Sequence, residues 1–251
     1  MPPFRSLLVV DAEKFSHHRD ADLPGVHTEI RRVLDRACAR SGLRETWERA
    51  PFQQSTGDGM LAALPLDAMI QLISPFADRL QDALAAAAPK FRAKGLRPLR
   101  LRVALHIGMV EDADPITGGI STATNDVNRL LDCGPLREAL DESDPDVTFA
   151  AVAVSDQAFE MFVRGGHTKL LPSRFTQVRA QVKQFDRPAH LYVPKPSKRE
   201  EDGGGPPAVA PPPPPGDGGS GQTFSGITFQ GDGNQNVFGN QVHGDINGGR
   251  S

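Results

Sequence analysis

The stretch Ser55-Thr56-Gly57-Asp58-Gly59-Met60 places one acidic residue between two glycines. The residues on either side, 52–54 and 60–64, have the character of short strands, so the stretch predicts the tight turn of a β-hairpin. An aspartate at such a turn is fixed in position and still reaches solvent. The hairpin is therefore expected to present the Asp58 carboxylate at a defined point on the surface.

A second acidic residue, Asp11, ends the apolar run 7–10, which predicts a buried strand. Two carboxylates held in this way could bind divalent metal together, as phosphoryl-transfer sites do. Each residue alone has an ordinary explanation, because Gly-Asp-Gly is a common turn and an aspartate after a strand often caps a helix. The order of the surrounding elements decides between these interpretations.

The first 195 residues predict, in order, a strand, a helix, the hairpin, a helix, a strand, a helix, a strand, a helix and a final pair of strands. Apolar residues recur at helical spacing over 25–41 and again over 70–84. Residues 99–107 alternate apolar and basic side chains like a half-buried strand, and 147–154 predict a further strand. Helices interleaved with a largely antiparallel sheet indicate an α+β fold.

Five segments of this domain, taken in order, resemble the catalytic domain of class III nucleotidyl cyclases. They are Asp11-Ala12-Glu13-Lys14-Phe15-Ser16, Gln54-Ser55-Thr56-Gly57-Asp58, Arg102-Val103-Ala104-Leu105-His106-Ile107-Gly108, Thr124-Asn125-Asp126-Val127-Asn128-Arg129-Leu130, and Val182-Lys183-Gln184 before a last strand. Any one of them is a weak signal, whereas five in the family's order are specific. The resemblance implies a ferredoxin-like core with a mostly antiparallel sheet.

The resemblance also implies an activity, the conversion of a nucleoside triphosphate (NTP) to a 3′,5′-cyclic nucleotide and pyrophosphate. Asp11, Asp58 and the carbonyl of Ala12 would bind two Mg²⁺ or Mn²⁺ ions per site. Asn125 and Arg129, one helical turn apart, would orient the ribose and stabilise charge on the α-phosphate. Further substrate contacts are implied for Phe15, Ser16, Gln54 and Lys183. A homodimer is implied, with each site shared between protomers.

Without Asn125 and the surrounding match, Arg129 would be interpreted as a solvent-exposed helix arginine. Lys183 is explained equally well as a surface lysine, because Gln184 stands where the family has glycine. The sequence also departs from the family where the base is read, since Gln54 replaces a lysine and Gly118 replaces a polar residue. Neither purine-reading group is present, which leaves CTP or UTP open, as in the pyrimidine cyclases of bacterial antiphage defence. Lys14 replaces a glycine of the phosphate loop. A domain that binds nucleotide without turning it over is the second interpretation.

The sequence changes character after residue 195. Residues 196–222 are rich in proline and glycine and predict an extended linker. Residues 223–251 repeat Gly-Asn-Gln and predict short strands punctuated by glycine and asparagine. This pattern resembles the amyloid signalling motifs at the ends of bacterial and fungal immune proteins. Such a tail would recruit an effector protein with a matching motif. A disordered Gly/Asn extension is the alternative.

Composition excludes several classes of protein. The net charge of −3 argues against a nucleic-acid binder. No apolar run is long enough to span a bilayer and no signal peptide is evident, so a cytoplasmic protein is expected. Cys38 and Cys133 are expected to be reduced thiols. Two functions remain in competition: a homodimeric nucleotide cyclase, and a signalling adaptor that uses a cyclase-like domain to dimerise or to sense nucleotide.

Overall fold

The computed structural model describes residues 1–111 and 118–199. Most of the expected linker and all of the tail, residues 200–251, lie outside the described residues. The strands are β1 Phe4–Ala12, β2 Phe52–Ser55, β3 Gly59–Pro65, β4 Leu101–Met109, β5 Ala150–Ser155, β6 Thr176–Val182 and β7 Phe185–Tyr192. The helices are α1 Leu23–Arg40, α2 Arg44–Glu48, α3 Ala68–Gln71, α4 Ala77–Ala93, α5 Thr122–Leu131, α6 Gly134–Asp141 and α7 Asp156–Ala158.

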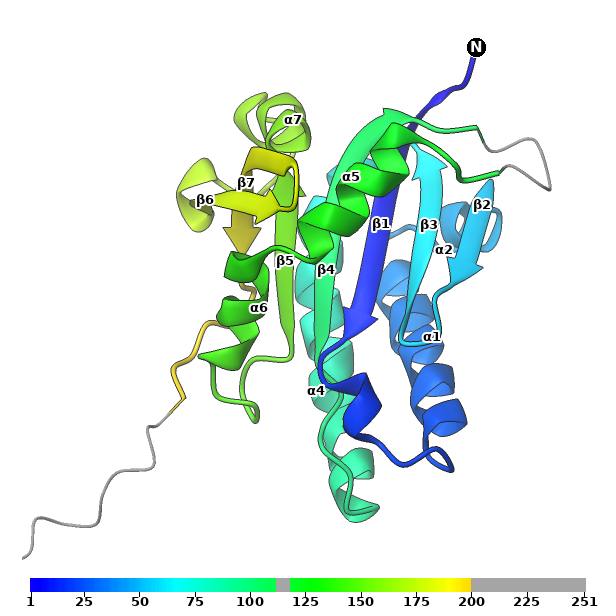
Figure 1. Cartoon of the computed structure of the whole chain (residues 1–251), viewed down its shortest axis with the longest axis vertical. Coiled ribbons are helices and arrows are strands. Elements are labelled where there is room, and N and C mark those ends of the chain that lie inside the picture. Colours follow the sequence, from blue (N-terminus) through cyan, green and yellow to red (C-terminus); the bar gives the residue numbers. More distant parts are fainter. Residues whose placement is uncertain (112–117, 200–251) are drawn as a thin grey trace, which may run out of the picture. The chain divides into compact units, whose positions relative to one another are not determined.

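The strands form one sheet with the order β2-β3-β1-β4-β5-β7-β6 (Figure 1). Neighbouring strands are antiparallel except β4 and β5, which run parallel. The first four strands, with α1 and α4 between them, follow the β-α-β-β-α-β succession of ferredoxin-like folds. The predicted α+β class with a mostly antiparallel sheet is confirmed.

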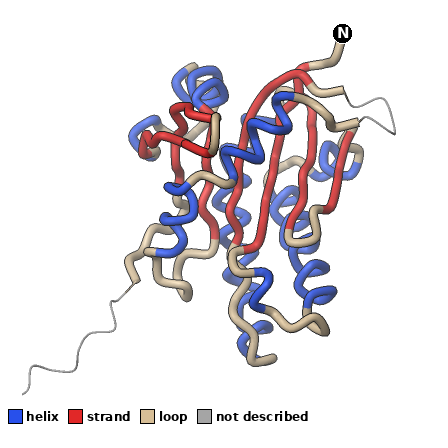
Figure 2. The backbone as a smooth tube through the Cα atoms, in the orientation of Figure 1, coloured by secondary structure: helices blue, strands red, loops and turns tan. Residues whose placement is uncertain are grey.

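Helices cover both faces of the sheet (Figure 2), with α1 and α4 on one face and α5 and α6 on the other. Alternate residues of the central strand β1 enter two different cores, because successive side chains of a strand point to opposite faces. Leu8 and Val10 pack with α1 and α4, whereas Leu7 and Val9 pack with α5 and α6. Burial on both faces explains why residues 7–10 of β1 are continuously apolar.

Two predicted elements differ in detail from the structure. The helix predicted over 70–84 is broken at Ser74, whose backbone is extended (φ −152°, ψ 121°). The residue before a proline avoids the helical region, so Pro75 imposes the break. The strand predicted from Val147 starts at Ala150, because the buried Gln81 side chain binds the Val147 carbonyl and the Phe149 amide in place of a neighbouring strand.

A buried arginine joins three parts of the chain at the end of the sheet where β1 ends and β4 begins. Arg100 is 4% exposed and precedes β4. Its guanidinium donates to the carbonyl oxygens of Thr148 and Leu140 and to the Ser143 hydroxyl. It also forms an ion pair with Glu13 at 2.8 Å. The loop after β1, the start of β4 and the segment between α6 and β5 are therefore held to one another.

The chain stays bound to the domain beyond the predicted boundary at residue 195. The Ser197 hydroxyl accepts from the Asp144 amide at 3.0 Å, and the Arg199 amide donates to the Glu142 carbonyl at 2.7 Å. Contacts with the loop before β5 thus continue to the last described residue before position 200. In the parts of the chain that the structure describes, no helix has the length and apolar character needed to cross a membrane.

Gly59 is placed where the hairpin passes closest to β1. A Cβ atom on this residue would lie 1.8 Å from the Val10 carbonyl oxygen, so strand pairing at this point admits only glycine. We expect Gly59→Ala to lower the free energy of unfolding by about 3 kcal/mol, since the backbone of β1 or β3 must shift. Urea unfolding measures the change.

Gly25→Ala is the matched control, because Gly25 lies in α1 with no atom within 4 Å of the added methyl group. That variant should be unchanged or more stable by up to about 1 kcal/mol. A Gly59→Ala protein as stable as the wild type would contradict the observed packing.

Candidate active site

Asp11 lies on an inner strand of the sheet, one residue before the end of β1. It pairs with Gly59 of β3 on one side and with Arg102 of β4 on the other. The residue is 8% exposed. Arg102 Nε donates to Asp11 Oδ1 at 2.9 Å, and Nη2 contacts Oδ2, so the carboxylate is held in a bidentate ion pair.

Asp58 is positioned by the turn between β2 and β3. Gly57 has φ of +91°, which glycine adopts without strain. The Asp58 carbonyl accepts from the Ala12 amide at 2.9 Å, and the Thr56 hydroxyl donates to Asp58 Oδ1 at 3.3 Å. The turn is thereby joined to the end of β1. The two aspartates expected to act together are neighbours in the structure.

Helix α1 contacts this turn through His27, a residue for which the sequence predicted no role. His27 Nδ1 lies 2.9 Å from the Gly57 carbonyl oxygen, and Nε2 lies 3.4 Å from Ser55 Oγ. A carbonyl oxygen only accepts hydrogen bonds, so Nδ1 carries the proton and donates. The position of Asp58 thus depends on the side chain of a helix thirty residues earlier in the chain.

The electrostatics of Asp11 favour a cation. Burial raises the pKa of the Asp11 carboxyl above its ordinary value of 3.8, while Arg102 acts in the opposite direction. The negative charges of Asp58 and Asp132 raise the pKa further. A second positive charge near Asp11 and Asp58 would relieve this repulsion. Carboxylate oxygens are the ligands that Mg²⁺ and Mn²⁺ prefer, so the donor set fits such ions.

Three cationic residues line a small cavity that is connected to Asp11 through Arg102. The cavity has a volume of about 140 Å³ and is lined by Glu13, Lys14, Arg102, Arg137 and Asp141. Lys14 Nζ lies 3.3 Å from both Glu13 and Asp141. Lys14 itself is left-handed (φ 55°), the conformation that glycine adopts most easily, at the position where the resembled family has glycine. The loop therefore keeps that backbone shape with a charged side chain added.

Helix α5 carries the predicted pair Asn125 and Arg129. The Ser121 hydroxyl caps this helix by accepting from the Thr124 amide at 3.0 Å. Val127 is buried against the sheet, whereas Asn125 and Arg129 are exposed. Within the described residues, the ion pair found for Arg129 is with Asp126 of the same helix, at 3.6 Å. The structure does not bring Asn125 or Arg129 into hydrogen-bonding contact with Asp11 or Asp58 of the same chain.

The remaining predicted site residues lie on several elements and differ in exposure. Phe15 is half-buried against the core and Ser16 is exposed, both in the turn after β1. Gln54 is exposed on the edge strand β2. Lys183 is exposed at the β6–β7 turn, with φ of 53°. Ala12, the expected carbonyl ligand, is the last residue of β1.

Comparison with known proteins supports the fold. No family model matches the chain, and no curated protein matches it. A bacterial light-regulated adenylyl cyclase matches 80% of this chain and 55% of its own length, with 12% identity and a TM-score of 0.52. The adenylyl cyclase CyaB from P. aeruginosa matches 80% of this chain and 98% of its own, with 13% identity and a TM-score of 0.50.

An adenylate/guanylate cyclase/hydrolase from Silicibacter pomeroyi is 22% identical over 77% of this chain and 98% of its own, with a TM-score of 0.48. At these identities the likeness concerns the fold. The first 199 residues, as far as they are described, thus share the architecture of adenylyl cyclase domains. This agrees with the fold that the five sequence segments imply.

The titration of Asp11 tests the described charge arrangement. In the protein without added metal, the carboxyl should titrate above 3.8, as burial requires. Arg102→Gln should raise the pKa further, because the favourable cation is lost, and Asp58→Asn should lower it, because the neighbouring negative charge is lost. Carbon-13 NMR of the aspartate carboxyl groups measures both shifts.

Asp186 is the internal control, because its pKa is lowered by Arg179 on β6 and should respond to neither substitution. The raised pKa of Asp11 also affects metal binding. Metal needs the ionised carboxylate, so metal affinity should fall with decreasing pH at a higher pH than for an ordinary aspartate. A shift of Asp11 in the same direction in both variants would contradict the arrangement.

Proposed function

We propose that the protein is a nucleotide cyclase that converts an NTP to a 3′,5′-cyclic nucleotide and pyrophosphate. One observation carries the proposal. The β1-β3-β4 pairing holds Asp11 and Asp58 side by side, within a fold shared with solved adenylyl cyclase domains. Packing of the core does not explain these carboxylates. Burial of the Asp11 carboxylate is unfavourable, and its ion pair with Arg102 offsets that cost only in part.

Asp11, Asp58 and the Ala12 carbonyl would hold two Mg²⁺ or Mn²⁺ ions. Bound there, the ions supply a lowered pKa at the ribose 3′-hydroxyl and neutralise charge on the triphosphate. The chain itself supplies position. The amide of Ala12 fixes the Asp58 carbonyl, and Arg102 fixes the Asp11 carboxylate, so both ligands are oriented before substrate arrives.

Lys14 and Arg137 would receive the phosphates. Both line, together with Arg102, the cavity next to Asp11, and Arg102 stays bound to the carboxylate. A guanidinium binds phosphate and carboxylate oxygens with the same planar fork. Lys14 and Arg137 now neutralise Asp141 and Asp132, pairs that are partly exposed and cost little to exchange for a phosphate.

A second copy of the chain would complete each site. Asn125 and Arg129 face away from the sheet that holds the aspartates of their own chain, and Lys183 is exposed on another hairpin. Placed against a partner's Asp11 and Asp58, Asn125 would orient the ribose. Arg129 would bind the α-phosphate, where charge grows in the transition state, because its guanidinium stays protonated.

Base selection is proposed to differ from the purine cyclases. Gln54 is exposed on β2, and its amide can both donate and accept hydrogen bonds. It can therefore pair with the donor and acceptor groups on the edge of a pyrimidine. Gly118 offers no side chain. CTP or UTP is therefore the proposed substrate class. A role in bacterial defence, with a tail at 223–251 that recruits an effector, is proposed on the sequence alone, because those residues lie outside the described part of the chain.

Turnover of each of the four NTPs with Mg²⁺ or Mn²⁺, followed by mass spectrometry of the products, tests the activity. Asp58→Asn keeps the turn and removes one charge of the metal site, so turnover should fall about 100-fold or more. Asp67→Asn is the control, since this exposed aspartate follows the other end of β3. If the wild type makes no cyclic nucleotide from any NTP, the adaptor function replaces the enzyme.

Mixing of inactive homodimers tests the shared site. Asp11→Asn and Arg129→Gln lie in opposite halves of each proposed site, so one of the two sites in a heterodimer is intact. A random mixture contains half heterodimers, and about a quarter of wild-type activity should return. Asp11→Asn mixed with Asp58→Asn is the control, because both changes fall in the same half and no site is restored. Absence of rescue in a mixture shown to contain heterodimers would rule out sites between protomers.

A further inference from the structure

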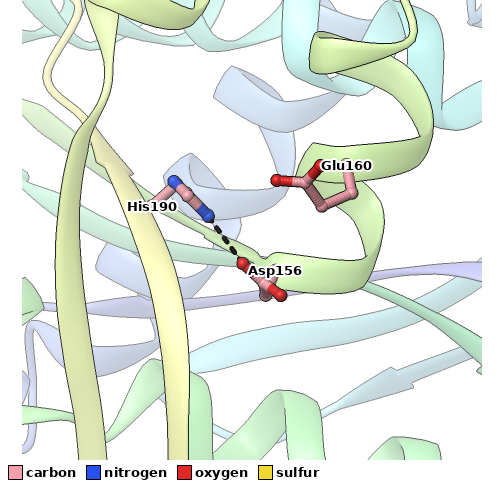
Figure 3. A group of neighbouring side chains, drawn as sticks. All are labelled: Asp156, Glu160 and His190. Atoms are coloured by element: carbon pink, nitrogen blue, oxygen red, sulfur yellow. Dashed lines mark hydrogen bonds and ion pairs between the residues drawn. The ribbon is translucent and has the colours of Figure 1, made fainter.

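A histidine and two carboxylates gather where helix α7 meets strand β7 (Figure 3). His190 Nε2 lies 2.9 Å from Asp156 Oδ1, and the Glu160 carboxylate points toward the same space. One donor atom from each residue lies within 4.8 Å of the other two. None of the three belongs to the candidate active site.

Secondary structure brings the three residues together. Asp156 is the first residue of α7, after Ser155, whose hydroxyl caps the helix by accepting from the Ala158 amide. The helix continues as a wider turn over Phe159–Arg164, so Glu160 follows Asp156 by about one turn on the same side. His190 comes from β7, where antiparallel pairing sets it opposite Val154 of β5.

The histidine is enclosed in the core, whereas both carboxylates reach solvent. His190 is 3% exposed and stacks on Phe159, with ring centroids 3.6 Å apart. Asp156 and Glu160 have side chains that are roughly half exposed, and Glu160 pairs with Arg164 at the surface. A buried imidazole beside two carboxylates that solvent reaches is an arrangement that can bind a metal ion.

The distances also suit a metal. Ligand atoms about 2.1 Å from one zinc ion lie about 3.0–3.4 Å from each other. The His190–Asp156 separation of 2.9 Å is close to that range, and Glu160 needs a side-chain movement of little more than 1 Å to join them. Imidazole nitrogen with carboxylate oxygen favours first-row transition ions over Mg²⁺ or Ca²⁺.

This cluster is separate from the aspartates of the candidate active site. Asp11 stands opposite Arg102, which pairs with Ala151 of β5, and Asp156 follows five residues further along that strand and helix. Five residues of strand span about 16 Å. Two strand spacings add to the distance, so one ion cannot contact both groups.

We propose that Asp156, Glu160 and His190 bind a divalent transition metal ion, with Zn²⁺ the best match. The ion takes Nε2 of His190 and one oxygen from each carboxylate, and water fills the remaining position. Binding replaces the His190–Asp156 hydrogen bond and releases Arg164 from Glu160. The ion joins α7 to β7, next to the aromatic contacts of Phe159, and stabilises the end of the sheet opposite the active site.

Zn²⁺ titration of the full-length chain tests the site, in an Asp58→Asn background that weakens metal binding at the candidate active site. Competition with a chromogenic chelator gives affinity and stoichiometry, and thermal unfolding with and without Zn²⁺ gives the stabilisation. Glu160→Gln keeps the size of an exposed side chain and should fold normally. It should lose one zinc equivalent or bind it at least about tenfold more weakly, and it should lose the zinc-dependent rise in Tm.

Glu48→Gln is the matched control, because Glu48 is also an exposed glutamate paired with an arginine four residues away, Arg44. That variant should bind zinc like its parent. Asp156→Asn should behave like Glu160→Gln, and zinc held by His17 and His18 would survive both changes. Unchanged zinc affinity, stoichiometry and Tm rise in Glu160→Gln would overturn the proposal.

Discussion

The buried guanidinium of Arg100 is the constraint around which this end of the domain is built. A charge removed from water is tolerated only with a counterion and with its donors satisfied. Arg100 obtains both from Glu13 and from acceptors between residues 140 and 148. Glu13 belongs to the loop after β1, whereas the other partners belong to the end of α6 and the segment that leads to β5, so these two parts of the chain must meet where the arginine ends. The first of them is the loop that follows Asp11 and contains Lys14.

Arg100 and Arg102 show how much context decides the role of a residue. The two lie two positions apart at the start of β4, and each forms an ion pair with the segment 11–13. Arg100 is enclosed and structural, whereas Arg102 lines a cavity and holds Asp11. The alternating pattern predicted the strand but not this division. The difference comes from the segment before β5, whose oxygen atoms accept hydrogen bonds from Arg100.

The sequence was sufficient for the order of the elements, which follows from apolar periodicity and turn signals. The meeting of Asp11 with Asp58 depends on the pairing of β1 with β3, which no local rule gives, and only the resemblance to the cyclase family implied it. The supporting contact of His27 was not predictable, because it joins the middle of a helix to a turn and leaves no periodic signal. The same applies to the approach of His190 to Asp156, which depends on the register of β5 with β7. The break at Ser74 did have a signal, Pro75, which the helical spacing of the apolar residues outweighed.

The two contacts of His27 with the turn can form with either charge state of its ring. In the neutral tautomer, Nδ1–H donates to the Gly57 carbonyl, and bare Nε2 can accept from the Ser55 hydroxyl. A protonated ring keeps the first bond unchanged, and its Nε2–H donates to the same hydroxyl, which merely rotates. Proton uptake by His27 therefore exchanges donor for acceptor without removing a contact. The turn that holds Asp58 is thus joined to helix α1 by the same two contacts in either form of the ring.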